Sequence, residues 1–405
     1  MSVPLLDVSD HQRRVAELIG PTGSERVSAA EAAGRVLAEP VVAAEPLPAF
    51  DNSAMDGYAV RAADVAGASD ASPVVLPVAG DIPAGAPVGR LEPGTAVRIM
   101  TGAPLPAGAD AVVEVEVTDG GTTTVAVRSE RAAGSFVRPA GGDVATGSTV
   151  LEPGTVLGPA QVGVLAALGV DEVVVRRRPR VLVCSTGSEL AEHPDPAAGQ
   201  IRDSNGALLA TAVEQAGGEA VSRLWVADDV PAFLAALDRE IDGPTPPDLV
   251  ITTGGVSMGA YEVVKEALGT RGVEFVKVAM QPGMPQGAGR YRDVAVVCLP
   301  GNPVSALTSF EVFARPALRA AYGHPRPRRP VVRATLGTEL SSMPGKRQLR
   351  RGRLDPVHGT VEPWGPPGSG FLGWFAGADC LIDIASDVTA VGAGEVVDVW
   401  DLSTG

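Results

Sequence analysis

Three glycine-containing loops near the middle of the chain are the segments best suited to chemistry. They read "STGSEL" (185–190), "TTGGVSMG" (252–259) and "PGNPVSA" (300–306), and each follows an apolar, strand-like run. Glycine lets the backbone approach a ligand closely, and a helix that begins after such a loop presents free N–H groups to an anion. Asn302 and Pro303 fit the first positions of a helix. Any one loop is equally typical of an ordinary turn, but three in one sheet favour a phosphate- or pterin-type site.

Three acidic residues next to these loops are candidate ligands for a divalent cation. Glu189 lies in the first loop, Asp228 belongs to "VADDV", and Glu262 lies three residues beyond the second loop. Mg²⁺ typically uses one or two carboxylates together with substrate phosphates. The alternative is that these acids are solvated or cap helices, as Asp229 directly before "VPAF" is placed to do.

The charge of the chain limits its partners. The formal net charge is −15, with 45% hydrophobic and 20% charged residues, as in a soluble globular protein. Such a field repels nucleic acid and anionic membranes, so neither is expected as a partner. An anionic substrate would need local cations, helix N-termini or a divalent ion. Lys265, on a predicted helix, and Lys277, inside the strand-like run "FVKVAM", are the candidate cations.

The cysteines indicate a reducing compartment. Cys184, Cys298 and Cys380 lie far apart in apolar runs, and no metal-binding spacing of cysteine and histidine is present. Buried, reduced thiols and a cytoplasmic protein are therefore expected. The first residues lack the pattern of a signal peptide, and no apolar run is long enough to cross a bilayer.

Residues 179–326 alternate between apolar strands and helical segments. Strands are predicted at "RVLVCST", "AVSRLWV", "DLVITT", "EFVKVAM" and "VAVVCLP". Continuous apolar strands that alternate with helices are typical of a mostly parallel sheet covered on both faces. We therefore predict a central three-layer α/β domain, closed by one long helix over 302–323.

The rest of the chain predicts a mixed domain and two β-rich modules, so the fold class is multidomain α/β plus β. Helices are expected over 5–19 and from Ser28, where "SAAE" forms a capping-box pattern. Short alternating runs between Gly/Pro turns predict the β-modules. The predicted domains are 1–50 with 140–178 (mixed linker domain), 51–139 (inserted β-rich module), 179–326 (α/β domain) and 327–405 (small C-terminal β-barrel).

The inserted module also contains polar residues that could face a ligand. The stretch "AFDNSAMDGYAVR" (49–61) gathers two carboxylates, an amide and a hydroxyl in apolar surroundings. Its first polar residues are typical of a chain reversal, whereas Asp56 stands beyond them. Thr101 in "RIMTGAP" and Asp143 behind two glycines either form turns or contact a ligand.

The ordered set "FDNSAMDGYAVR", "RIMTGAPLPAGADAVV", "STGSEL", "TTGGVSMG", "QPGMP" and "LPGNPVSA" resembles the MoeA and gephyrin C-terminal domain family of molybdopterin molybdenumtransferases. The resemblance covers about residues 5–400 in the same order. It implies an elongated homodimer, with each active site between the α/β domain of one subunit and the β-module of the other. The implied reaction inserts molybdate into adenylylated molybdopterin with Mg²⁺ and releases AMP.

The resemblance also assigns roles to individual residues. The implied catalytic residues are Asp56, Thr101, Asp143, Glu189, Asp228 and Glu262, of which the last three are also the implied metal ligands. The implied substrate-binding residues are Ser185, Thr186, Gly187, Gly254, Gly255, Ser257, Lys265, Lys277, Pro300, Gly301, Asn302, Pro303 and Ser305. The implied molybdate-binding residues are Pro285, Ser305, Lys346, Arg351 and Ser369.

Two departures from the family pattern concern the charge around the oxyanion. Gln281 and Met284 stand in "QPGMP" where the family has lysines, and neither can replace a positive charge. Either neighbouring basic residues compensate, or the chain is a paralogue that binds molybdopterin or acts as a scaffold. A generic nucleotide-handling α/β enzyme is a third hypothesis, which leaves the β-module motifs without a role. The sequence does not separate molybdate from tungstate, nor does it show whether a molybdopterin adenylyltransferase docks on the chain.

Overall fold

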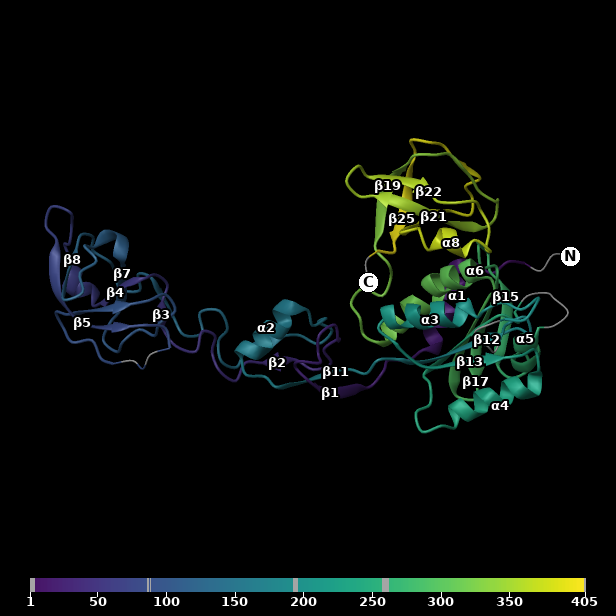
Figure 1. The fold of residues 1–405 in the computed structure, drawn as a ribbon, viewed down its shortest axis with the longest axis horizontal. Helices are drawn as coiled ribbons and strands as arrows, with labels where there is room; N and C mark the ends of the chain where they lie inside the picture. The colour runs from purple at the N-terminus through teal and green to yellow at the C-terminus, as the bar shows by residue number, and fades with distance from the viewer. Residues whose placement is uncertain (1–3, 86, 88, 192–195, 257–261, 404–405) are drawn as a thin grey trace. The chain divides into compact units, whose positions relative to one another are not determined.

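The computed structural model describes residues 4–403 apart from 86, 88, 192–195 and 257–261. The chain divides into two compact units (Figure 1). The first consists of Met1–Glu25, Gly154–Val156 and Val175–Gly405, and the second of Arg26–Pro153 and Leu157–Val174. This division into two units does not test the four predicted domain boundaries, which remain a prediction.

A six-stranded sheet with helices on both faces forms the centre of the first unit, and the predicted three-layer α/β fold is confirmed (Figure 1). Five strands run in one direction, and β17 runs against them. Alternate residues of β12 serve the two layers: Val181 and Val183 face α1, α3 and α6–α7, while Leu182 faces α4 and α5. The strands in sheet order are β13 (Glu219–Val226), β12 (Arg180–Thr186), β14 (Leu249–Thr253), β18 (Val294–Leu299), β17 (Pro285–Tyr291) and β15 (Val273–Lys277), and the helices are α1 (Val8–Leu18), α3 (Ser204–Gln215), α4 (Val230–Ile241) and α5 (Val263–Leu268).

The predicted long helix is continuous but not uniform. It consists of α6 (Pro303–Ser309), a π-helical turn (Phe310–Ala314) and α7 (Arg315–Ala321). Pro316 has no N–H to donate to the carbonyl of Val312, four residues earlier, and a proline inside a helix disturbs the preceding turn. The side chain of Gln12 on α1 donates to that carbonyl instead, at 3.1 Å.

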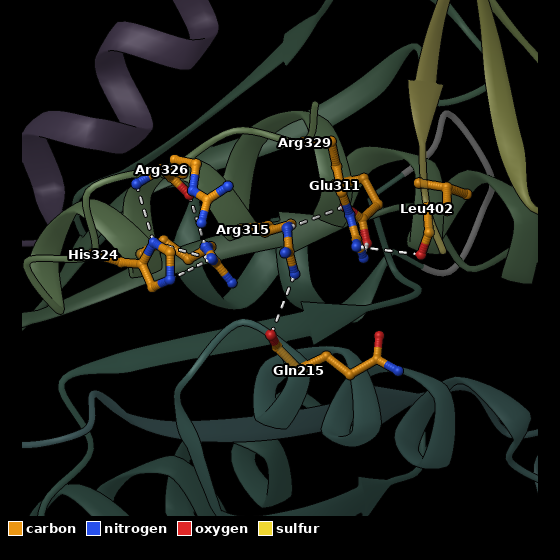
Figure 2. A network of polar contacts seen from close by, with 8 residues as sticks. Gln215, Glu311, Arg315, His324, Arg326, Arg329 and Leu402 are labelled. Atoms are coloured by element: carbon orange, nitrogen blue, oxygen red, sulfur yellow. Dashed lines mark hydrogen bonds and ion pairs between the residues drawn. The ribbon is translucent and has the colours of Figure 1, made fainter. Parts of the chain in front are cut away.

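The π-helical turn carries a buried carboxylate that holds the C-terminal segment in place. Glu311 accepts two hydrogen bonds from Arg329, at 2.8 and 2.9 Å, and lies 3.6 Å from Arg315 (Figure 2). Arg329 also donates to the carbonyl of Leu402, and Arg315 donates to that of Gln215 on α3. The long helix, the linker after it and the end of the chain therefore share one network.

The C-terminal segment forms the predicted small β-barrel. Five strands close on themselves in the order β21, β22, β19, β25, β23 and back to β21. Its interior is filled by Leu336, Val361, Ile382 and their neighbours. A short strand, β16 (Met280–Gln281), pairs with β21 and joins the α/β domain to the barrel. The barrel strands are β19 (Val331–Leu336), β21 (Arg347–Asp355), β22 (Thr360–Pro363), β23 (Cys380–Ile384) and β25 (Val396–Asp401), with β20 (Leu340–Ser341) pairing β24 (Ala390–Val391) and α8 (Leu372–Phe375) nearby in the chain.

The second unit contains the predicted β-rich module, a five-stranded sheet around Tyr58, Val113 and Val125. The helix predicted from Ser28 is wrong. Ser28 and Glu31 make the capping-box contacts, but only turns follow, because Gly34 donates to the carbonyl of Leu157 and the chain pairs with distant segments. The strands are β1 (Ser24–Ser28), β2 (Val41–Val42), β3 (Asn52–Ser53), β4 (Gly57–Val60), β5 (Val74–Ile82), β6 (Ala96–Ile99), β7 (Ala111–Glu114), β8 (Thr124–Val127), β9 (Val137–Arg138), β10 (Thr149–Leu151) and β11 (Glu172–Arg176), with helix α2 (Pro159–Ala167).

Removing the charge of Glu311 should destabilise the first unit strongly. Glu311→Gln removes the carboxylate charge that faces buried Arg315 and accepts from Arg329, and breaking such a buried pair costs about 3–5 kcal/mol. The control Asp242→Asn breaks the exposed pair with Arg292 and should cost less than about 1 kcal/mol. All four tryptophans of the sequence lie beyond residue 175, so urea unfolding followed by tryptophan fluorescence reports this unit. Equal effects of the two substitutions would contradict the role of the network.

The buried His11 predicts a stability that falls with acid. Both ring nitrogens are buried without a partner among the described residues, and burial lowers the pKa of His11 from 6.5 to about 4. Between these values the unfolded chain binds a proton that the folded chain does not, so stability is lost as the pH falls from 6.5 toward 4. His11→Phe should remove about 2 kcal/mol of the loss between pH 7.5 and pH 5.

The measurement is the unfolding free energy at pH 7.5 and pH 5, again by tryptophan fluorescence. His358→Phe, a surface substitution, is the control and should leave the acid sensitivity of the wild type unchanged. An acid sensitivity that survives His11→Phe undiminished would assign it to other groups, of which His324 is the first to test, since burial also lowers its pKa to about 4.

Candidate functional site

A cleft of about 590 Å³ lies at the carboxyl ends of β12, β14 and β18, where the three predicted loops meet. Most of the residues that the sequence assigned to substrate binding line it, from all three loops. They are Ser185, Thr186, Gly187, Gly254, Gly255, Pro300, Gly301, Asn302, Pro303 and Ser305, together with the predicted oxyanion residues Pro285 and Ser369. Ser257 lies outside the described residues.

The three loops are held together by a short chain of hydrogen bonds, which begins where Thr186 Oγ1 of the first loop donates to the carbonyl of Thr253 in the second at 3.3 Å. Thr253 donates to the carbonyl of Pro300 at 3.0 Å, and Asn205, at the start of α3, donates both to Thr253 Oγ1 at 3.0 Å and to the carbonyl of Gly301 at 2.6 Å. Gly254 has φ +93°, and a Cβ there would overlap the carbonyl oxygen of Thr186. The floor of the cleft therefore depends on backbone contact that only glycine allows.

Two buried polar atoms in the cleft have no partner among the described residues. They are Ser185 Oγ and Asn205 Oδ1, and both belong to residues that line the cleft. Buried polar groups are nearly always hydrogen-bonded, because an unpaired one costs free energy. Unpaired groups in an open cleft are suited to bind a polar ligand.

The three predicted acids line the same cleft, but they do not form a preassembled metal site. Asp228 accepts from the backbone N–H of Ser188 at 3.0 Å, and the carboxylate of Glu189 lies against Gly187. No group of three acidic, histidine or cysteine side chains among the described residues could hold a metal ion. Glu189, Asp228 and Glu262 would therefore supply only part of a Mg²⁺ coordination shell, and further oxygen ligands would have to come from a bound ligand or water.

The predicted cations do not lie in the cleft. Lys265 and Lys277 line a neighbouring pocket of about 550 Å³, which shares Val256 and Pro285 with the cleft. The predicted oxyanion residues Lys346 and Arg351 line another pocket, which we call the basic pocket.

The basic pocket has a volume of about 310 Å³ and adjoins the cleft, since both are lined by Ser305 and Ser369. Asn302 donates to Ser369 Oγ at 2.9 Å, which fixes the barrel loop against the start of α6. Gln281 and Met284, the two departures from the family pattern, line the basic pocket as well.

The remaining predicted catalytic residues belong to the second unit. Asp56 is exposed and accepts from both the N–H and the hydroxyl of Thr101, each at 2.7 Å. These two bonds lower the pKa of Asp56, the backbone bond most. Asp143 is exposed as well, and its backbone N–H donates to Leu47. Asp51, by contrast, accepts from the N–H of Ala140, so it has the structural role expected of a turn.

Two groups of residues at these pockets were not predicted from the sequence. Asn205 links the second and third loops, yet in "DSNGALL" it has only the signal of a helix start. Arg350 and Gln348 line the basic pocket, but the sequence of their strand, β21, does not differ in pattern from that of the other barrel strands. Contacts between segments far apart in the chain define both groups, and a local pattern does not contain them.

Three family models match consecutive parts of the chain. "MoeA N-terminal region (domain I and II)" matches residues 6–169, "Probable molybdopterin binding domain" residues 182–320, and "MoeA C-terminal region (domain IV)" residues 333–402. The α/β domain with its glycine-loop cleft is thus of the molybdopterin-binding class. The chain belongs to the MoeA family, and the resemblance stated from the motifs is confirmed.

Relatives match over nearly the whole length. Molybdopterin molybdenumtransferase 2 of Mycobacterium tuberculosis is 54% identical over 98% of this chain and 99% of its own length. Molybdopterin molybdenumtransferase 1 of the same organism is 39% identical over 97% and 98%. Among solved structures, a molybdopterin biosynthesis MoeA protein from Pyrococcus horikoshii matches with a TM-score of 0.84 and 31% identity, over 98% of this chain and 99% of that chain.

Gly254→Ala should disrupt the cleft more than the fold. A Cβ at φ +93° pushes on the carbonyl of Thr186 and should cost about 1–3 kcal/mol. The control Gly373→Ala lies in α8 with nothing within 4 Å of the added methyl group, and it should be neutral or slightly stabilising. Fluorescence-detected unfolding and titration with a molybdopterin ligand measure the two effects. Unchanged ligand affinity in Gly254→Ala would contradict the assignment of the cleft.

Proposed function

We propose that this chain is a molybdopterin molybdenumtransferase, which inserts molybdate into adenylylated molybdopterin and releases AMP. The observation that carries the proposal is the pair of adjoining pockets. The glycine-loop cleft suits a ligand with phosphates, and the basic pocket, joined to it through Ser305 and Ser369, suits a small oxyanion. Names of relatives over the full length support this transferase and do not favour a scaffold without turnover.

The residues of the cleft would act by binding and orienting the substrate. Backbone N–H groups after Gly254 and Gly301 and the hydroxyl of Ser185 would hold its polar groups, and Asn205 would keep the second and third loops in register. Glu189, Asp228 and Glu262 would hold Mg²⁺ together with the phosphates of the substrate. Bound Mg²⁺ would neutralise charge on the phosphoanhydride. Tungstate is nearly isosteric with molybdate, and the basic pocket offers no feature that separates the two.

We propose in addition that Asp56, Thr101 and Asp143 act on a ligand in the cleft of a second copy of the chain, in a homodimer. The support is chemical: Asp56 is an exposed carboxylate, held ionised by two hydrogen bonds from Thr101. An exposed ionised group that is already oriented can take part in catalysis at little entropic cost. The proposal also includes the docking of a molybdopterin adenylyltransferase on this chain, and a cytoplasmic location. No helix in the described ranges has the length and apolar character to pass through a bilayer.

The proposal is tested by release of AMP from adenylylated molybdopterin. Release should require both molybdate and Mg²⁺, and Asp56→Asn should slow it about 100-fold or more. Asparagine keeps the oxygen that accepts from Thr101, so the loop should stay folded while the charge is lost. Asp70→Asn, an exposed acid of the same unit, is the control and should keep the full rate. A wild type that binds the substrate without releasing AMP would refute the transferase, and a fully active Asp56→Asn would refute the role of Asp56.

A further inference from the structure

Trp225 lies near the end of the edge strand β13 and connects that strand to the first glycine loop. It is half-buried, and its register partner on β12 is Ser185, the first residue of the loop. The indole Nε1–H donates to the backbone carbonyl of Gly187 at 3.2 Å. Many apolar side chains could fill this place on a strand, but indole differs from the aliphatic ones in having an N–H group to donate.

The peptide group between Gly187 and Ser188 is held through both its carbonyl and its N–H. The carbonyl accepts from Trp225 and also from the N–H of Leu190, at 3.1 Å. The N–H donates to a carboxylate oxygen of Asp228 at 3.0 Å, and the N–H of Asp228 donates in return to Ser188 Oγ at 3.2 Å. The peptide group therefore cannot rotate without losing hydrogen bonds, which costs free energy.

Two acids of the cleft depend on this peptide group for their placement. Gly187 has φ +148°, and a Cβ there would overlap the carboxylate of Glu189, which lies directly against the glycine. The carboxylate of Asp228 is bonded to the N–H of the next residue. Both acids line the cleft. The orientation of one peptide group thus determines how the two carboxylates are placed relative to each other.

We propose that Trp225 is a positioning residue of the cleft. Its indole N–H fixes the peptide group 187–188 and, through it, the placement of Glu189 and Asp228 for a ligand that carries a phosphate. The inference rests on the proposed function, which assigns the phosphates of the substrate to this cleft. Trp225 is not one of the described residues that line the cleft, so it acts through the loop. A ligand that meets groups already in place loses less free energy to ordering them.

Binding of AMP to the full chain, in a buffer that contains Mg²⁺, tests this role without turnover. Trp225→Phe keeps an aromatic ring and removes the N–H donor. Calorimetric titration should show AMP binding weakened about two- to tenfold, the usual effect of one lost hydrogen bond. Trp400→Phe is the matched control, because its indole N–H donates to Asp383 in the barrel, at 2.9 Å. It should keep the wild-type affinity for AMP, with a change in Tm by circular dichroism similar to that of Trp225→Phe.

The indole N–H resonances of the wild type give a second readout, which a purely structural role would not change. The sequence has four tryptophans and therefore four such resonances in an NMR spectrum. Trp364→Phe, Trp374→Phe and Trp400→Phe each remove one, which assigns the fourth to Trp225 even if Trp225→Phe does not fold. AMP should shift the resonance of Trp225, since its acceptor belongs to the loop that contacts the ligand, and should leave that of Trp400 in place.

The role is overturned if Trp225→Phe binds AMP as the wild type does, if Trp400→Phe weakens AMP binding equally, or if AMP leaves the Trp225 resonance in place. A wild type that binds no AMP overturns it as well. Release of AMP from adenylylated molybdopterin, measured on the same preparations, keeps the two proposals apart. AMP binding that depends on Trp225 without such release would reject only the transferase. Normal release together with unaffected AMP binding in Trp225→Phe would reject only the role of Trp225.

Discussion

The buried ion pair between Glu311 and Arg329 is the constraint on which the geometry of the first unit depends. Arg329 lies just before the first barrel strand, and its second contact, the carbonyl of Leu402, lies just after the last one. The pair thus fixes both ends of the barrel to the helix that begins at Pro303 in the cleft. Taking both charges out of water costs free energy that their attraction repays only in good geometry. What the pair supplies is one specific way to dock the barrel, which places Ser369 and the basic pocket beside the cleft.

The two adjoining pockets carry ionisable side chains of mostly opposite sign. The cleft offers neutral donors, hydroxyl groups and the three acids Glu189, Asp228 and Glu262, whereas the basic pocket offers cations and no described carboxylate. In a chain of net charge −15, an oxyanion is repelled at long range and attracted only close to the basic pocket. A single site with both kinds of charge would pair them with each other. Keeping them in separate pockets leaves the cations available to an anion and the acids available to a metal ion.

The sequence predicted the parts of the structure that local patterns determine. The alternation of strands and helices, the three glycine loops and the barrel are confirmed, because hydrophobic period and turn residues act over a few neighbours. The helix expected from Ser28 does not form, because contacts distant in the sequence outweigh its local signal. Its capping box forms, but Gly34 and the residues after it hydrogen-bond to segments more than 100 positions away. The antiparallel strand β17, rich in glycine, has no strong strand pattern either. The loop 366–371 accepts hydrogen bonds from Arg351, and no pattern within β21 predicts that contact.

Both pockets contain buried polar groups without a partner among the described residues. Away from the pockets, other buried atoms also lack a partner in the described part of the chain, among them both ring nitrogens of His11 and Arg315 Nε. At the pockets the chain leaves Ser185 Oγ, Asn205 Oδ1 and Gln348 Oε1 without partners among the described residues. Folding alone would select against such groups, since each costs free energy in the unliganded state. A ligand that completed those at the pockets would regain that free energy on binding, and the cost in the unliganded protein would then contribute to affinity.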